Sequence, residues 1–411
     1  MARYGLLHGT FASVAFSVVV GSIAMPAAYA QEAVRPEIGK PLQAASALLK
    51  ANKFKDALAK IHEVDSVSGK TPNEIYLIES MRGSAASGTG DNDTIIKSFE
   101  AVIASGKAPA ATQIKIIEAL VGAHYRAKDY AATNKWATRY LRDGGSNPQI
   151  RTLLIQSNFQ AGDFANAAKE SLADIHADEK AGRTPSEEKL QLLANSYLRQ
   201  KNTAGYISTI EKLLNYYPKK SLWADVISRL QRKPGFSDRL AIDVYRMQLA
   251  TGNLITKDDY MLMPQLALQA GFPGEAKKVV DEGYANGALG KGADVDRQKR
   301  LRDLVEKRVA ENQKAISGGA EDAAANAAKD GNALVNLGYN LFTSGQAAKG
   351  ITMMEAGIKK GDLKRPDDAK LLLGTALIQS GQKAKGVQVL KTVQGTDGTQ
   401  DLANLWAIFA R

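Results

Sequence analysis

The sequence contains no cysteine at all. Disulfide bridges and an anchor acylated on cysteine are therefore both excluded. Aromatic residues make up only 7% of the chain, whereas alanine and glycine are plentiful, as expected where helices pack closely in hairpins. Beyond the N-terminal segment, no apolar run is long enough to cross a membrane. A chain of 411 residues is too long for one ordinary hydrophobic core, but it suits a solenoid, whose core grows with length.

Residues 1–30 have the features of a secretory signal peptide. Arg3 supplies a positive start, an apolar run extends from Phe11 to Val20, and Ala28-Tyr29-Ala30 forms a small-x-small cleavage site. A membrane anchor is the alternative, but the apolar run is short for spanning a bilayer and is followed by glycine and proline. We therefore expect an exported, periplasmic protein of a bacterium, with no transmembrane anchor.

The stretch Leu337–Met354 is repeated 36 residues later. Ser344-Gly345-Gln346 returns as Ser380-Gly381-Gln382, and apolar residues at three- and four-residue steps flank both copies. This spacing predicts two helices joined by a short turn, and a period in this range is typical of a solenoid. Gly338 and Gly350 are expected where two helices cross, because the absent side chain lets the backbones approach each other.

Similar turns occur along the rest of the chain, and neighbouring ones that can be aligned lie 34 to 39 residues apart. The candidate turn residues are Asn52, Gly90, Lys128, Gly162, Lys201, Gly271, Gly345 and Gly381. Each is preceded and followed by residues with helical apolar spacing. The sequence therefore predicts a series of stacked helical hairpins with no β-sheet.

These hairpins resemble the tetratricopeptide repeat (TPR). The resemblance is carried by a Gly-Asp-Phe turn at Gly162, by Leu193-Ala194 and Tyr197 in a first helix, and by the closing Pro218. The sequence departs from the motif at Ile95 and Tyr206, where the repeat prefers alanine, and a related α-solenoid remains an alternative. The expected fold class is an all-α solenoid of TPR-like hairpins.

We expect five segments along the chain. The signal peptide (1–30) precedes a loose leader (31–40), and an N-terminal solenoid covers 41–315. Glycine and alanine dominate 316–331, which we interpret either as a joint or as one irregular repeat. Residues 332–411 then form C-terminal repeats, and Leu402–Phe409 is expected to be the closing helix that covers the last apolar face.

The chain is basic, with 54 lysines and arginines against 43 acidic residues. Cleavage after Ala30 would remove only Arg3 from this count. The densest basic cluster, Arg297–Arg308, contains interleaved acidic residues, as a solvated helix face with ion pairs does. A nucleic-acid-binding surface is the more specific interpretation of this cluster, but the predicted export of the protein makes it less favoured. An acidic partner in the cell envelope remains open.

The sequence predicts no catalytic, cofactor or metal site. His62, His124 and His176 fall in different repeats, and none has a second histidine at metal-ligand spacing. The polar set Asp174–Glu179 is interpreted as a helix end, and Gly83–Gly90 lacks the lysine of a phosphate loop. No nucleophile can be paired with a base. We therefore expect a binding surface rather than an enzyme.

The resemblance implies that the first helices of successive hairpins line a groove. Aligning the turns places eight candidate residues there: Tyr125, Arg126, Gln156, Gln160, Asn195, Arg199, Tyr339 and Thr343. Arg126, Gln160 and Arg199 occupy equivalent positions and should form a row, which would suit an extended peptide. The alternative is that these are ordinary solvated helix residues.

The expected function is a non-enzymatic periplasmic scaffold or adaptor that binds a protein or peptide partner in the cell envelope. The alternative is a module that handles polysaccharide or peptidoglycan. A row of aromatic residues would favour sugar, because sugar rings stack on aromatic faces. Only Tyr125, Phe159 and Tyr339 are candidates for such a row.

Overall fold

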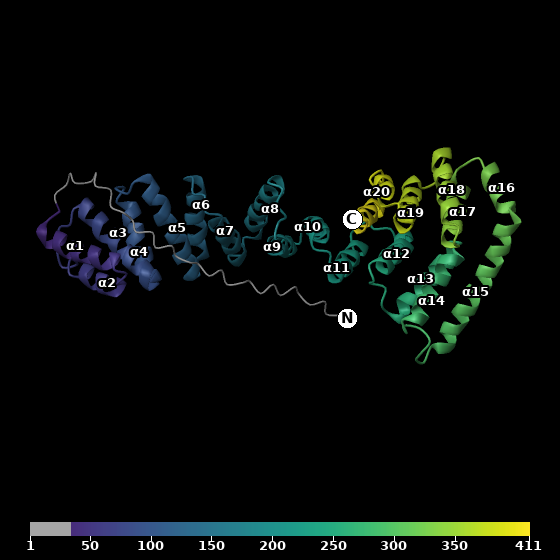
Figure 1. Cartoon of the computed structure of the whole chain (residues 1–411), viewed down its shortest axis with the longest axis horizontal. Helices are drawn as coiled ribbons and strands as arrows, with labels where there is room; N and C mark the ends of the chain where they lie inside the picture. The colour runs from purple at the N-terminus through teal and green to yellow at the C-terminus, as the bar shows by residue number, and fades with distance from the viewer. Residues whose placement is uncertain (1–33) are drawn as a thin grey trace. The chain divides into compact units, whose positions relative to one another are not determined.

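The computed structural model describes residues 34–411, and in this part of the chain every regular element is a helix (Figure 1). The prediction of an all-α fold is confirmed. The predicted signal peptide, 1–30, lies outside the described residues. None of the described helices is long and apolar enough to cross a membrane. Backbone contacts divide the chain into two compact units, the first ending at Asn202 and the second starting at Thr203.

Unit 1 is a run of helical hairpins in chain order, in which each helix packs against its sequence neighbours. Its helices are α1 (Pro36–Lys50), α2 (Phe54–His62), α3 (Pro72–Thr89), α4 (Asn92–Ala104), α5 (Ala110–Arg126), α6 (Tyr130–Arg142), α7 (Pro148–Gln160), α8 (Phe164–Lys180) and α9 (Glu187–Arg199). Two apolar clusters run through it, one within α1–α3 and one within α3–α7. A core that extends along the stack in this way defines a solenoid.

The first helix begins inside the segment that we expected to be a loose leader, 31–40. Pro36 is the first residue of α1, where its fixed φ suits a helix start and its missing N–H costs nothing. Arg35, just before it, donates from its backbone N, Nε and Nη2 to the carboxylate of Glu74 in α3. Glu74 is 1% exposed. The proline at the helix start, this tether and the buried side chain of Ile38 order the segment.

All eight predicted turn residues have positive φ, which confirms the turn assignments from the sequence. At each turn, the N–H of the following residue donates to the carbonyl five residues before it, as from Asp129 to His124 (3.0 Å) and from Asp163 to Asn158 (2.9 Å). This is the Schellman pattern of helix termination. The next helix then starts two residues after the positive-φ residue. Every hairpin of this set therefore has the same turn geometry.

Unit 2 contains the remaining helices. They are α10 (Thr203–Tyr216), α11 (Lys220–Gln231), the 3-10 helix η2 (Asp238–Leu240), α12 (Ala241–Ala250), α13 (Lys257–Gln269), α14 (Pro273–Ala285), α15 (Val295–Gly318), α16 (Ala320–Ala327), α17 (Asn332–Thr343), α18 (Ala347–Lys360), α19 (Pro366–Gln379), α20 (Lys383–Leu390) and α21 (Thr399–Phe409). The pairs α13/α14, α17/α18 and α19/α20 are hairpins of the same kind as in unit 1.

The glycine-mediated contact predicted for α17 and α18 is confirmed. A Cβ placed on Gly338 would lie 2.6 Å from the carbonyl oxygen of Gly350, and one on Gly350 would lie 2.3 Å from that of Gly338. In the next hairpin, a Cβ on Gly374 would lie 2.5 Å from the side chain of Leu390. The backbones of α17 and α18 therefore touch, and any larger residue would push them apart.

The closing helix forms as predicted, but it covers more than the last repeat. α21 packs on α19 and α20, and also on α10 and α12 from the start of unit 2. Lys233 Nζ lies 2.7 Å from the Asp401 carboxylate. The Trp223 and Phe409 rings meet edge to face at 6.1 Å. The last helix of unit 2 therefore packs on helices from the start of the same unit.

The segment 316–331 contains the end of α15 and the short helix α16, which packs on both α15 and α17. Gly319 has φ +67° and separates α15 from α16. Helix packing through this segment is continuous, and the boundary between the units lies elsewhere, after Asn202.

Candidate binding surface at the hairpin turns

The three residues of the predicted row are exposed and lie at equivalent places. Arg126, Gln160 and Arg199 are the last residues of α5, α7 and α9. They therefore lie beside the hairpin turns and not midway along the first helices. We call this surface of unit 1 the turn edge. It comprises residues 50–54, 88–92, 126–130, 160–164 and 199–202.

At the turn edge, the end of one first helix repeatedly meets the start of the second helix in the preceding hairpin. Arg126 Nε donates to Asn92 Oδ1 at 2.9 Å. The Arg199 guanidinium carbon lies 5.7 Å from the ring centre of Phe164. Gly88 has no side chain, and its place is filled by the Phe54 ring, 2.3 Å from where its Cβ would be. Two members of the predicted row, Arg126 and Arg199, thus also contact the preceding hairpin.

The half-buried candidates add an aromatic component. Tyr125 donates from its hydroxyl to Gln156 Oε1 at 3.0 Å, which joins α5 to α7, and burial raises the pKa of this tyrosine. Tyr125 and Tyr130 meet edge to face at 6.0 Å. In the next hairpin, Phe159 and Phe164 do the same at 5.2 Å. Asn195 is half-buried on α9.

Sequence reasoning missed Tyr130 and Phe164 as surface candidates because it treated both as parts of the turn motif. The sequence did contain a signal, because both aromatic residues follow the aligned turn residue of their hairpin by two positions. Phe54 occupies the same place in the first hairpin. Aligning the turns therefore identifies a recurrent aromatic position at the first residue of the second helix.

The turn edge carries more exposed cations than anions. Six cations lie on it: Lys50, Lys53, Arg126, Lys128, Arg199 and Lys201. The three carboxylates are all helix N-caps, because Asp91, Asp129 and Asp163 accept from the backbone N–H of Thr94, Ala132 and Asn166. Hydrogen bonds from Thr94 lower the pKa of Asp91. The carboxylates are thus engaged with their own helices, whereas the four lysines of the edge are exposed.

Tyr339 does not lie on an open groove, which corrects the prediction for this residue. It is 1% exposed and belongs to the core of unit 2. Its hydroxyl donates to Glu275 Oε1 at 3.2 Å, and its ring meets Phe272 at 4.8 Å. A Cβ on Gly274 would lie 2.4 Å from the carbonyl oxygen of Thr343, so the start of α14 covers this end of α17. The equivalence of repeats fails here because α14 packs on α17 and Arg246 of α12 lies over the Tyr339 ring.

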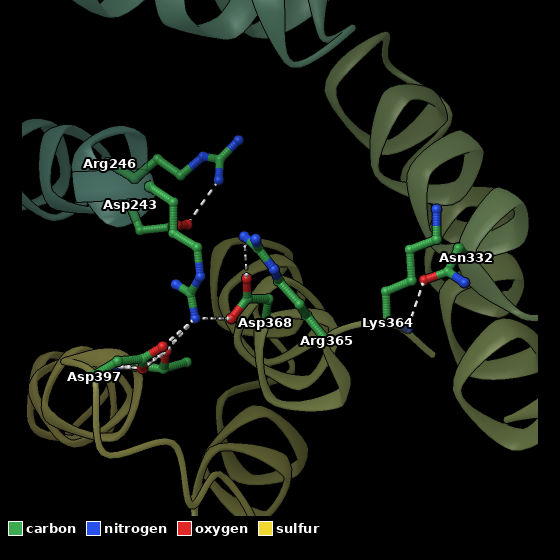
Figure 2. Close-up of polar contacts among 9 residues, drawn as sticks. Asp243, Arg246, Asn332, Lys364, Arg365, Asp368 and Asp397 are labelled. Carbon is green, nitrogen blue, oxygen red and sulfur yellow. Dashed lines mark hydrogen bonds and ion pairs between the residues drawn. The ribbon is translucent and has the colours of Figure 1, made fainter. Parts of the chain in front are cut away.

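Beneath Tyr339 lies a buried ionic cluster. Arg246 is 4% exposed and donates through Nε and Nη2 to both carboxylate oxygens of Glu275, each at 2.7 Å. Its Nη1 donates to Asp243 Oδ1 at 2.7 Å, as Figure 2 shows. Burial raises the pKa of Asp243. Burial alone would lower the pKa of Arg246, but Glu275 and the other partners outweigh this and hold it well above the usual value.

A second ionic group lies beside the first and links more distant segments. Arg239, in η2, donates through Nη2 to Asp368 Oδ1 at 3.0 Å and also to Asp397. Asp368 is at the start of α19, near Arg365, and Asp397 precedes α21 (Figure 2). These pairs hold the seam at which unit 2 closes. Each carboxylate of the two groups is paired with an arginine, so we assign both groups a structural role, although Arg239 Nη1 is buried without a hydrogen-bond partner among residues 34–411.

Residues 34–411 contain no group of three or more histidine, cysteine, aspartate or glutamate side chains that could hold a metal ion. In the polar set of α8, Asp174 and Asp178 both contact Lys189 Nζ, at 2.8 and 2.6 Å. His124 is 5% exposed, with Glu100 and Asp129 carboxylates 3.5 and 3.6 Å from its two ring nitrogens.

No family model matches the sequence, and no curated protein matches it either. Solved structures to which the chain is similar include the Naa15/Naa10 complex bound to HypK-THB, with 14% sequence identity over 89% of this chain and 63% of that chain and a TM-score of 0.34. Yeast Tom70 is 11% identical, with 91% of this chain and 95% of that chain covered and a TM-score of 0.24. The P58(IPK) TPR domain is 12% identical, with 91% of this chain and 97% of that chain covered and a TM-score of 0.23. The chain thus spans less than two thirds of the length of the Naa15/Naa10 chain. The repeated hairpins and their shared turn geometry define the fold as a TPR-like α-solenoid.

Proposed function

We propose that this protein is a non-enzymatic scaffold of the bacterial cell envelope that binds a protein or peptide partner through unit 1. One observation carries the proposal: Arg126, Gln160 and Arg199 are exposed at equivalent positions of three first helices. Such a row offers planar donors at regular intervals, which suits carboxylates and backbone carbonyls of an extended chain. Tyr125, Gln156 and Asn195 lie half-buried next to it.

The periplasmic location is part of the same proposal. It rests on the Ala28-Tyr29-Ala30 cleavage site and the apolar run before it. Cell fractionation followed by N-terminal sequencing tests it. A mature chain that starts at Gln31 in the periplasmic fraction is expected, and an intact chain starting at Met1 in the membrane fraction would contradict it.

The binding proposal is tested with the triple variant Arg126→Ala, Gln160→Ala and Arg199→Ala. The purified variant should capture less partner from an envelope extract than the wild-type chain. A matched control changes Lys97, Lys169 and Lys180 to alanine, since these are exposed on the second helices α4 and α8. The control should capture as wild type does. Equal capture by all three proteins, with all of them folded, would rule out this surface.

A polysaccharide or peptidoglycan ligand is the second candidate, and one observation favours it. The edge-to-face pairs Tyr125–Tyr130 and Phe159–Phe164 place rings in consecutive hairpins. Sugar rings stack on such faces. Binding of purified envelope glycans to unit 1 that is lost on Tyr130→Ala and Phe164→Ala would support this alternative over a protein partner.

A further inference from the structure

The turn edge presents charge of one sign to solvent. Lys53, Lys128 and Lys201 are exposed at the turns of three hairpins, and none of them has an ion-pair partner among residues 34–411. The three aspartates of the edge are bound as N-caps to their own helices. A ligand that approaches the turns therefore meets ammonium and guanidinium groups first. Charge complementarity selects an acidic ligand.

Apolar surface is interleaved with these cations. Phe54, Tyr130 and Phe164 begin the second helices of three hairpins, and all three are only partly buried. Next to Phe54 is an open hollow of about 450 Å³, whose lining includes Lys53, Lys55, Asp56 and Gly88. The glycine leaves room for the ring, and the two lysines flank it. The hollow therefore offers an aromatic floor with two lysines and one aspartate at its rim.

From these observations we infer that the turn edge of unit 1 docks an extended acidic peptide segment of the partner that also carries aromatic or aliphatic side chains. The cations bind its carboxylates, and the rings and the hollow receive its apolar side chains. This inference rests on the proposed function and specifies both the surface and the chemistry of the partner. It also places the contact at the turns, whereas the family resemblance implied a groove between first helices.

The test measures fluorescence anisotropy of a labelled synthetic peptide that alternates glutamate, phenylalanine and serine, added to the full mature chain. The test variant changes Lys53, Lys128 and Lys201 to glutamate. These positions are exposed, and at Lys128 and Lys201, where φ is positive, glutamate and lysine meet the same backbone strain. The matched control makes the same change at Lys97, Lys169 and Lys180, and circular dichroism checks that both variants fold.

We expect the turn-edge variant to bind the acidic peptide about tenfold more weakly or worse, and the control to bind within about twofold of wild type. Wild-type affinity should fall as salt is added. A peptide with glutamine in place of glutamate, and one with alanine in place of phenylalanine, should each bind more weakly. Those results would support both the charge and the aromatic parts of the inference.

Three results would overturn it. Equal weakening in the turn-edge and control variants would mean that only the overall charge matters. Tighter binding of an oligogalacturonate probe than of the acidic peptide, lost in the same variant, would assign the edge to an acidic glycan. Absence of acidic-peptide binding by the wild type, while the Arg126, Gln160 and Arg199 variant still loses envelope capture, would refute this inference and leave the proposed function standing.

Discussion

The contact between α17 and α18 gives the sharpest stability prediction. Replacing Gly338 by alanine would put a Cβ 2.6 Å from a backbone oxygen, whereas ordinary contact begins at 3.4 Å. The two helices would therefore have to separate by most of an ångström. Overpacking of this kind costs about 1–3 kcal/mol, and the helix propensity of alanine returns about 1 kcal/mol. We expect a net loss of up to about 2 kcal/mol.

The matched control is Gly318→Ala, which lies in the last turn of α15 with nothing within 4 Å of its Cβ. This variant should be as stable as wild type or slightly more stable. Urea unfolding followed by the fluorescence of Trp223 and Trp406, both in unit 2, compares the two. Because Gly338 and Gly350 touch each other, the double alanine variant should lose less than the sum of the single losses. A Gly338→Ala variant more stable than wild type would show that the helices do not touch.

Three further predictions follow from particular residues. Lys128 has φ +60°, so Lys128→Gly should raise the free energy of unfolding by about 1 kcal/mol in a urea titration, and unchanged stability would argue against that backbone geometry. Arg35 and backbone N–H groups lower the pKa of Glu74 to about 2, so its carboxylate stabilises the fold above the unfolded pKa and this stabilisation is lost as pH falls toward 2. Glu74→Gln should cost about 1–3 kcal/mol at pH 7 and flatten the acid limb of a stability–pH curve, and an unchanged curve would exclude this role. Arg246→Met leaves Glu275 buried without its partner and should cost about 3–5 kcal/mol by thermal or urea unfolding, whereas a loss below 1 kcal/mol would mean that the cluster is hydrated.

Turn positions could be predicted from the sequence because they depend on local chemistry. Glycine or asparagine ends a helix in the left-handed region, and the aspartates at 91, 129 and 163 cap the helix that follows. Lys128 and Lys201 were identified only by alignment with the other turns, since lysine has no preference for positive φ. The start of α1 at Pro36 was missed because the tether from Arg35 to Glu74 spans 39 residues.

Long-range packing could not be predicted in the same way. Nothing in the repeat pattern states that α21 returns to α10 and α12, and this return decides which surfaces remain open in unit 2. The pattern made Tyr339 equivalent to Gln156 and Asn195, which are half-buried in unit 1, yet Phe272, Glu275 and Arg246 cover Tyr339 fully. In unit 1, where only sequence neighbours pack, Arg126, Gln160 and Arg199 are exposed at equivalent positions, and their role in binding stays a prediction.

Photo-crosslinking tests the central claim most directly. Benzoylphenylalanine is placed at Gln160 on the turn edge, or at Lys169 on α8, and each chain is irradiated in intact envelopes. Both residues are exposed, and they are only nine positions apart, so they differ chiefly in the surface that they occupy. A specific adduct from position 160 and none from position 169 is the predicted result. An adduct from position 169 alone would place the partner on the second helices and contradict the account.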